Sequence, residues 1–285
     1  MNSALADSTA EDARPASVTA RVEYLGAMPQ RPRFHMGDPT LDRNIVEQVA
    51  VTIRDARPGR HELTLDQHGF MLMDHPTAVR NPCDADEIER VYRPELRSAV
   101  QAITGATHVI ISARGVVRLA ERSREFGAPG TTYPAKQVHS DYTLTSGPQM
   151  VRAHLDPDEA QARLSQRFII LSLWRAFSPP PQDVPLALCD AQSVAPEDCV
   201  LSDIVIGPPG RETVFEGSNF RFNPRHRWHY FRDMRRDELL LIKAFDSDGS
   251  RAWRVPHTSF IDPSAPPDSP PRESMDIRAI AFFDD

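Results

Sequence analysis

The chain of 285 residues is long enough to bury a sizeable hydrophobic core, in one large domain or two small ones. Its formal net charge of -7 at pH 7 leaves no basic surface of the kind that binds nucleic acid. No apolar run is long enough to span a bilayer, and residues 1–15 lack the pattern of a signal peptide. These features favour a soluble cytoplasmic protein with neither nucleic acid nor a membrane as its partner.

The N-terminal third mixes short strands with one helical region. Residues 1–15 are small, polar and acidic, and we expect them to form a disordered tail. Alternation of polar and apolar residues predicts a strand over 18–25, and shorter strands are expected at 48–54 and 69–73. A helix opens with the acidic residues from Asp84 onward, resumes after Pro94 and ends at Gly105.

Short apolar segments typical of strands dominate the rest of the chain. A buried strand is predicted at 107–112, and the basic segment 114–124 that follows favours a solvated face or a flexible loop. After a predicted helix at 156–168, further strands are expected at 169–174, 186–189, 203–206, 227–231, 238–245, 252–257 and 277–283. So many short strands imply a mainly β fold, a β-sandwich or jelly roll with helices packed outside. No repeat or shift in composition marks a second domain.

A histidine and an aspartate are spaced for metal binding in the predicted strand 138–143. His139 and Asp141 are two residues apart, so their side chains would point to the same face of that strand. If His257 comes from a neighbouring strand, the set becomes two histidines and one carboxylate. This facial triad binds Fe(II) and leaves positions open for a co-substrate and oxygen.

Chance alone produces such spacings, so the context of each one matters. With 10 histidines and 40 acidic residues in the chain, about one or two His-x-acid matches are expected at random. A second match is His154-Leu155-Asp156, where Asp156 is placed to cap a helix and Pro157 follows at its first position. Asp141 has no comparable structural explanation, and a carboxylate within a strand is otherwise costly.

Trp174 and Arg175 stand out because they interrupt an apolar strand. Arg175 is a candidate for binding an acidic group of a substrate, with Trp174 beside it. The alternative for Arg175 is a buried ion pair, with Asp190 or Asp246 as its partner.

Other polar residues give weaker signals. His226 and His229 are three residues apart and would face opposite sides of a strand, so we expect a substrate-lining or structural role for His229 rather than a second metal site. Tyr142 either reaches a co-substrate bound at the neighbouring Asp141 or fills the core with its ring. No Gly-x-Ser-x-Gly nucleophile motif occurs, and Cys189 lies in an apolar strand where a thiol is inert.

Longer phrases around these residues resemble a known family. His257 is followed by Arg272-Glu273-Ser274, an Arg-x-Ser motif, and further matching phrases lie at 173–175, 185–190, 226–231, 245–248 and 266–274. From about Ser17 to its end, the chain resembles the iron(II)- and 2-oxoglutarate-dependent oxygenases, in the CmcJ/AsaB/NvfI-like branch of hydroxylases and desaturases.

The resemblance implies a fold and a set of cofactors. The implied fold is a double-stranded β-helix, the cupin-like jelly roll, with an N-terminal α/β part packed on it, so that residues 16–285 form a single oxygenase domain. The implied cofactors are Fe(II), 2-oxoglutarate and O2. His139, Asp141 and His257 are then expected to be the metal ligands and the catalytic centre.

The resemblance also implies how 2-oxoglutarate is held. Arg272 is expected to pair with its distal carboxylate through two hydrogen bonds, which a planar guanidinium suits better than an ammonium group. Ser274 would add a further hydrogen bond. Arg278 is the rival anchor, because it lies among apolar residues of the last predicted strand, where a lone charge needs a partner.

The implied reaction is hydroxylation, desaturation or oxidative cyclisation of a small specialised metabolite or a modified amino acid, and the sequence does not distinguish these outcomes. Asp141 stands where a halogenating relative carries a small residue, which argues against chlorination. One alternative is a cupin-like metal-dependent hydrolase or isomerase, since the same ligands accept Zn or Mn. Another is a non-catalytic β-sandwich binding protein in which the three residues are dispersed. The oligomeric state stays open.

Overall fold

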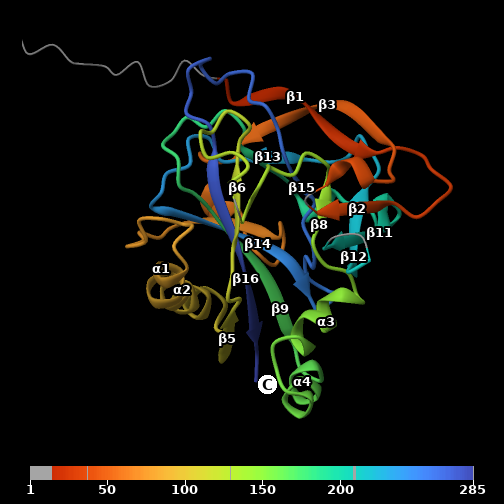
Figure 1. Ribbon diagram of the computed structural model, residues 1–285, viewed down its shortest axis with the longest axis vertical. Coiled ribbons are helices and arrows are strands. Elements are labelled where there is room, and N and C mark those ends of the chain that lie inside the picture. Colours follow the sequence, from red (N-terminus) through yellow and green to blue (C-terminus); the bar gives the residue numbers. More distant parts are fainter. Residues whose placement is uncertain (1–14, 37, 129, 208–209, 285) are drawn as a thin grey trace, which may run out of the picture.

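Two curved sheets make up most of the structure, a computed structural model that describes residues 15–36, 38–128, 130–207 and 210–284 (Figure 1). The nine-stranded sheet contains, in spatial order, β1 (Ser17–Leu25), β3 (Val46–Asp55), β13 (Trp228–Tyr230), β10 (Leu186–Cys189), β15 (His257–Ser259), β8 (His139–Ser140), β12 (Thr213–Phe220), β11 (Cys199–Ile206) and β2 (Arg33–Met36). The seven-stranded sheet contains β4 (Phe70–Asp74), β14 (Glu238–Asp246), β9 (Phe168–Ala176), β16 (Glu273–Phe282), β6 (Val116–Leu119) and β7 (Thr131–Thr132), and β5 (His108–Ile111) also pairs with β16.

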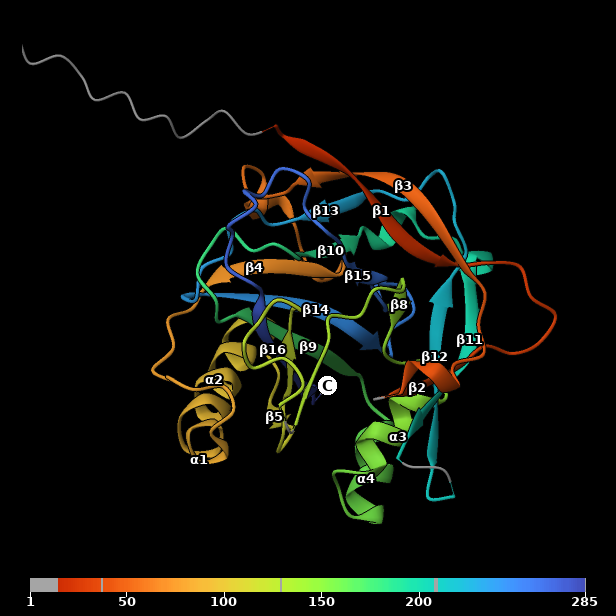
Figure 2. The same cartoon turned by 45° about the horizontal axis from the view of Figure 1, so that its top comes forward.

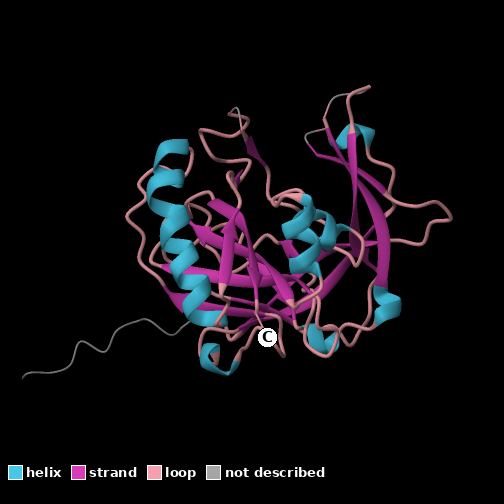
Figure 3. Cartoon of the chain, turned by 90° about the horizontal axis from the view of Figure 1, so that it is seen from below, coloured by secondary structure: helices cyan, strands magenta, loops and turns pink. Residues whose placement is uncertain are grey.

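Helices lie at the periphery of the sheets. They are α1 (Ala85–Glu87), the π-helical turn η3 (Ile88–Tyr92), α2 (Arg93–Thr104), α3 (Ser146–Arg152) and α4 (Pro157–Leu164), with 3-10 turns η1 (Pro39–Leu41), η2 (Arg60–Glu62), η4 (Ala191–Ser193) and η5 (Pro196–Asp198). Seen from below, the long helix formed by α1 to α2 runs along one flank of the strands (Figure 3). The expectation of a mainly β fold with peripheral helices is therefore confirmed.

The seven-stranded sheet has two faces of different chemistry. Its outer face packs on α2, where Leu96 and Val100 meet Leu171, Leu173 and Ile277 in one buried cluster. Its inner face is turned toward β8 and β15 of the other sheet (Figure 2). Because consecutive strand residues point to opposite faces, each strand contributes to both layers.

The inner face changes from apolar to polar across the sheet. On the β4 and β14 side, Phe70 and Ile242 pack against Leu188 of β10 in a buried cluster between the sheets. On β16 the inward positions include Asp276 and Arg278. The polar half of this face lies next to β8 and β15 and borders the site described below.

Local signals located the starts of α1 and α4 and the end of α2 correctly, whereas the helix predicted to reach residue 168 ends at Leu164. The side chain of Asp84 accepts hydrogen bonds from the backbone N–H groups of two first-turn residues, and Gly105 ends α2 with a φ of 71°. The helix does not stop before Pro94, because the π-helical turn ahead of it carries the chain across the proline, which has no N–H to donate. Asp156 caps α4 in the same way as Asp84, as expected.

Several strand predictions were wrong at their boundaries. Residues 252–256 are irregular, and the strand begins only at His257. The strand predicted over 138–143 is limited to His139–Ser140, so Asp141 lies just beyond it. The segment 114–124 is not a solvated loop throughout, because it contains β6, which pairs with β16. Strands β2 and β12 and helix α3 were not predicted.

The predicted N-terminal tail, residues 1–15, falls outside the described residues except for Pro15. Within the described ranges, no helix is both long and apolar enough to cross a membrane. The described cysteines Cys83, Cys189 and Cys199 are all unpaired.

Candidate metal centre

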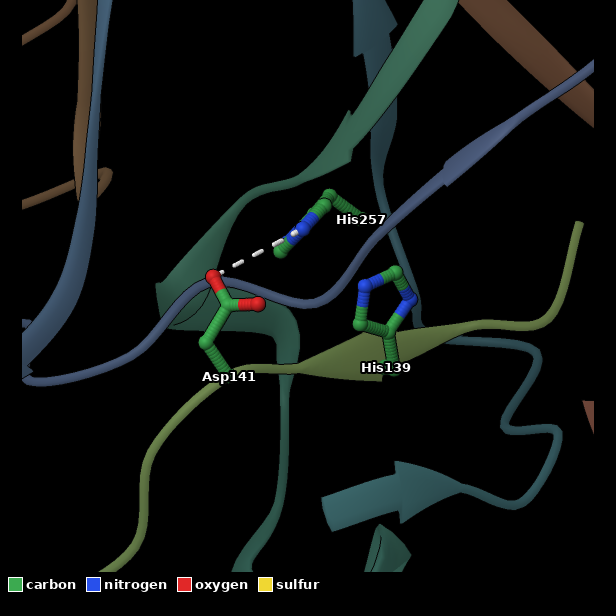
Figure 4. Close-up of side chains that lie close together, drawn as sticks. All are labelled: His139, Asp141 and His257. Atoms are coloured by element: carbon green, nitrogen blue, oxygen red, sulfur yellow. Dashed lines mark ion pairs between the residues drawn. The ribbon is translucent and has the colours of Figure 1, made fainter. Parts of the chain in front are cut away.

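His139, Asp141 and His257 meet between the two sheets. Strands β8 and β15 are antiparallel, with His139 directly opposite His257, so the two imidazoles lie on the same face with ring centroids 4.3 Å apart. Asp141 follows β8 and turns its carboxylate toward them, as Figure 4 shows. Ligand atoms from all three residues lie within 4.8 Å of one another. The structure thus brings together the three residues that the sequence singled out.

Hydrogen bonds set the orientation of both histidines. Nδ1 of His139 lies 2.8 Å from the carbonyl oxygen of Gln137, and Nδ1 of His257 lies 3.0 Å from that of Val255. A carbonyl oxygen can only accept, so each Nδ1 carries a proton, and in the neutral form of the ring the lone pair is then on Nε2. This outer hydrogen bond is the arrangement that orients metal-binding histidines.

The ionisation of the centre also suits a cation. Burial, together with the neighbouring His257, lowers the pKa of His139 to about 4, so its imidazole is neutral at pH 7. Burial alone would raise the pKa of Asp141, but the charge of Arg278 and then the two imidazoles hold it below its ordinary range. The centre therefore presents the neutral imidazole of His139 and the carboxylate of Asp141 side by side with His257.

The two oxygens of Asp141 have different surroundings. Oδ1 lies 3.0 Å from Nη2 of Arg278. Oδ2 is buried without a hydrogen-bond partner, 3.9 Å from Nε2 of His257. An unpartnered buried carboxylate oxygen is costly, and a metal ion would satisfy it. The donor set of two imidazole nitrogens and one carboxylate oxygen fits Fe(II).

A small inner pocket of about 20 Å³ lies at these residues, between the two sheets. Its lining includes the apolar side chains of Trp174, Leu186 and Ile242 and the guanidinium of Arg272. The pocket therefore combines the three candidate ligands with apolar walls and a buried cation.

Arg272 and Ser274 have polar atoms that no protein group satisfies. Arg272 is 1% exposed and donates from Nη1 to the carbonyl oxygen of Val184 at 2.8 Å, while its Nε has no partner. The Oγ of Ser274, two residues further along the strand, is also buried without a partner. Burial, and then the charge of Arg118, lower the pKa of Arg272 to about 9. Unsatisfied buried donors of this kind indicate a missing acceptor.

A larger outer cavity of about 670 Å³ borders His139 and Asp141 and opens toward solvent. Its walls include the apolar side chains of Phe34, Ile204 and Phe215. Met36, Phe126 and Ile206 also line it and are 46%, 44% and 44% exposed, so the rim is apolar as well. A cavity of this size and lining is typical of sites for small organic molecules.

The remaining predicted site residues are dispersed. Tyr142 lines the outer cavity and interacts with Arg278, while its ring packs on the cluster around Phe168. Trp174 lines the inner pocket. His229 lies on β13, separated from β15 by β10, and its ring is 6.0 Å from that of Phe70. It lines neither the inner pocket nor the outer cavity.

Arg175 follows Trp174 in β9 and therefore points to the outer face of the sheet. It donates to the hydroxyl of Tyr92 at 3.0 Å and to the carbonyl oxygens of His75 and Arg236. The expected ion pair is wrong, because Asp190 pairs with Arg227 and Asp246 with Arg167 and Lys243. The substrate-binding prediction for Arg175 does not fit this placement either.

Arg118 is a residue of the site that the sequence analysis did not single out. Arg118 projects from β6 and lines both the inner pocket and the outer cavity. Its Nε lies 3.3 Å from Oδ2 of Asp276. The phrase Val116-Val117-Arg118-Leu119 places a lone charge in an apolar run, the same signal that singles out Arg278.

Comparisons with known proteins agree with this site. A model of the family described as "Oxidoreductase/YMDC permease-like domain" matches residues 22–282. The chain is 29% identical over 238 residues to the Fe(II)/2-oxoglutarate-dependent dioxygenase nvfI of Aspergillus novofumigatus, covering 81% of this chain and 82% of that protein. It is 32% identical over 267 residues to the hydroxylase/desaturase CTB9 of Cercospora beticola, covering 87% of this chain and 81% of that protein.

The fold is also similar to a solved structure, the iron and alpha-ketoglutarate-dependent endoperoxidase NvfI. The TM-score is 0.81 at 24% sequence identity, and the alignment covers 95% of this chain and 99% of the other. This likeness shows the fold, and it confirms the expected cupin-like jelly roll.

Proposed function

Because the chain belongs to the family of Fe(II)- and 2-oxoglutarate-dependent oxygenases that includes hydroxylase/desaturases, we propose that it oxidises a small specialised metabolite by hydroxylation, desaturation or oxidative cyclisation. Enzymes of this family use Fe(II), 2-oxoglutarate and O2. The observation that carries the proposal is one pocket whose lining includes the convergent donor atoms of His139, Asp141 and His257 together with Arg272, whose Nε is unsatisfied.

We assign the metal to His139, Asp141 and His257. Their free donor atoms are Nε2 of each histidine and Oδ2 of the aspartate. Bound Fe(II) supplies the oxygen binding and the one-electron oxidation that side chains cannot provide. The contribution of the protein is to hold three donors on one side of the ion and to leave its other side open.

We assign the inner pocket to 2-oxoglutarate. A dicarboxylate with a short methylene stem suits a lining that combines the candidate metal ligands and Arg272 with the apolar side chains of Trp174, Leu186 and Ile242. Arg272 and Ser274 would receive the distal carboxylate, because the Nε of Arg272 and the Oγ of Ser274 have no partner in the protein. Charge-assisted hydrogen bonds would then satisfy both atoms.

We assign the outer cavity to the substrate, which we expect to be largely apolar and uncharged. Five acidic and four basic side chains line the cavity, so the balance of formal charge is 4 − 5 = −1: Glu23, Asp42, Glu121, Asp141 and Asp276 against Arg114, Arg118, Lys136 and Arg278. Lys136 and Glu121 form an ion pair at 2.8 Å. Charges that neutralise one another give an ionic substrate little to bind.

Three residues that line the cavity carry a buried polar atom without a hydrogen-bond partner, namely Gln137 at Oε1, His35 at Nδ1 and Asp141 at Oδ2. The side-chain oxygen Oε1 of Gln137 is buried and unpaired, and Gln137 lines the cavity two residues before His139. We assign it to a hydroxyl or N–H group of the substrate, which would orient the carbon to be oxidised toward the metal centre.

The alternatives account for less of the site. Membership of the family makes the chain an enzyme, so a non-catalytic binding protein is set aside. A hydrolase or isomerase built on the same ligands leaves the unsatisfied donors of Arg272 and Ser274 without a role.

Two further assignments are also proposals. We propose that residues 16–285 act as one oxygenase domain. We also propose that the enzyme works in the cytoplasm without nucleic acid or a membrane as partner, which suits its three unpaired cysteines and its net charge of -7.

An anaerobic titration tests the proposal. Metal-free protein receives Fe(II) and then 2-oxoglutarate, and the visible charge-transfer band of the chelate is recorded. We expect a band that disappears in His139→Ala, Asp141→Ala and His257→Ala variants. Bound metal without a band would contradict the proposal and favour the hydrolase or isomerase.

A further inference from the structure

Arg278 lies beside the candidate metal centre, but both of its terminal nitrogens, Nη1 and Nη2, already have partners in the protein. Its Nη1 donates to Oγ of Ser172 at 2.6 Å and to Oδ1 of Asp276 at 2.7 Å. Its Nη2 lies 3.0 Å from Oδ1 of Asp141. Arg272 differs, because its Nε has no partner and only its Nη1 contacts a carbonyl oxygen.

Strand register places these groups side by side. In the pairing of β16 with β9, Arg278 stands opposite Ser172, and Asp276 stands opposite Trp174. All four therefore share the inner face of the sheet. Arg118 of the neighbouring strand β6 reaches the second oxygen of Asp276. The charges thus alternate along a chain that runs Arg118, Asp276, Arg278, Asp141.

We propose that Arg278 is a positioning residue for Asp141, and that it does not anchor the co-substrate. It holds Oδ1 of Asp141, so that only Oδ2 is offered to the metal, while Asp276 and Ser172 hold Arg278 in place. The inference rests on the proposed function, because it takes Asp141 to be a metal ligand.

The chemistry of a carboxylate explains why such a residue is needed. A carboxylate can bind a metal through one oxygen or through both. When a guanidinium is bound to Oδ1, only Oδ2 is left to bind the metal. The metal then keeps one more coordination position for other ligands. Because Asp276 and Asp141 both neutralise Arg278, it also has little charge left to attract the second carboxylate of a co-substrate.

The first experiment uses the metal alone, with Mn(II) as the probe and its free concentration followed by electron paramagnetic resonance. Loss of an outer-shell partner typically weakens metal binding by about 10- to 100-fold, and we expect that loss in Arg278→Met. Arg278→Lys should recover part of the affinity because it keeps the charge. Arg90→Met, which removes an exposed arginine, is the matched control and should bind Mn(II) like the wild type.

Loss of net charge and loss of folding need separate controls. The double variant Arg278→Met/Asp276→Asn removes one charge of each sign, so weaker Mn(II) binding in that variant reports positioning rather than charge. Ser172→Ala removes only one hydrogen bond to Arg278 and should have the smallest effect of the series. Circular dichroism verifies that each variant is folded. Unchanged Mn(II) affinity in folded Arg278→Met and in the double variant would overturn the proposal.

The second experiment asks which arginine recognises the distal carboxylate. Binding of 2-oxoglutarate and of 2-oxovalerate, which ends in a methyl group instead, is measured by the charge-transfer band of the anaerobic Fe(II) protein. Arg278→Met should keep the wild-type ratio of the two affinities within about twofold, because the two interactions are independent. Arg272→Met should reduce the ratio.

The two experiments can contradict the inference and the proposed function independently of each other. A fall in the affinity ratio of Arg278→Met would identify Arg278 as the anchor and overturn the inference. If wild-type protein binds Mn(II) but shows no preference for 2-oxoglutarate, the proposed function fails instead, while the Mn(II) series still decides whether Arg278 positions Asp141.

Discussion

Arg175 and Arg272 are both buried, 0% and 1% exposed, but they lie on opposite faces of the seven-stranded sheet. Arg175 faces the outer layer, where Tyr92, His75 and a further carbonyl oxygen accept its hydrogen bonds. Arg272 faces the inner layer above the ring of Trp174, 5.7 Å from its centroid, and its Nε is unsatisfied.

The difference shows how to separate a structural arginine from a ligand-binding one. Burial is the same in both, so burial does not distinguish them. What differs is whether the protein supplies enough acceptors, since a buried guanidinium without them is costly unless a ligand provides the rest. Substitutions in the inner layer should therefore lower ligand affinity with little effect on stability. Matched substitutions in the outer layer should lower stability with little effect on ligand affinity.

The largest difference is expected for the histidines. His257→Ala removes a proposed metal ligand and should weaken Mn(II) binding by more than about 100-fold, beyond the loss typical of an outer-shell residue. His75→Ala, its counterpart in the outer layer, removes a partner of Arg175 and should cost about 1–3 kcal/mol of stability. Metal titration and urea denaturation measure the two effects. Equal metal affinity in both variants would contradict the assignment of the centre.

The two arginines come next. Arg272→Met should weaken 2-oxoglutarate binding by about 2–4 kcal/mol, or about 30- to 700-fold, because a buried charge pair loses one partner. Its stability should change by less than about 1 kcal/mol, since replacing a poorly satisfied buried charge with an apolar side chain is often neutral. Anaerobic titration and urea denaturation provide the two readouts.

Arg175→Met is the matched variant in the outer layer. It leaves the hydroxyl of Tyr92 and two carbonyl oxygens without their donor, and we expect a loss of about 3 kcal/mol or more in the free energy of unfolding. Folded Arg175→Met protein should bind 2-oxoglutarate with wild-type affinity. A similar loss of affinity in both arginine variants would mean that the inner layer has no special role.

The smallest difference is expected for two hydroxyl groups. Ser274→Ala should weaken 2-oxoglutarate binding by about 1 kcal/mol, roughly fivefold, and leave stability unchanged because Oγ has no protein partner. Tyr92→Phe removes a hydrogen bond to Arg175 and should lower stability by about 1–3 kcal/mol without changing that affinity. A Ser274→Ala variant with lower stability and normal affinity would show that its hydroxyl is structural.

Features that depend on neighbours in the chain could be predicted from the sequence. Asp84 and Asp156 cap helices because a short acidic side chain reaches the backbone N–H groups two and three residues ahead. Gly105 ends α2 because it adopts a positive φ without steric cost. The sequence also singled out the three residues that meet between the sheets, since the spacing of His139 and Asp141 and the Arg-x-Ser motif after His257 can be read from the chain alone.

Features that depend on contacts across the sheets could not be predicted from the sequence. Trp174 and Arg175 are adjacent in an apolar run, and periodicity does not say which of them faces the pocket. The outer layer decides it, because Tyr92 of η3 accepts a hydrogen bond from Arg175 there. Arg118 looks like part of a basic loop until β6 is paired with β16. The same holds for Arg278, whose contact with Asp141 joins residues far apart in the chain. Local sequence sets backbone preference and helix capping, whereas the partner of a buried charge is set by which strands pair, and that pairing exists only in the folded chain.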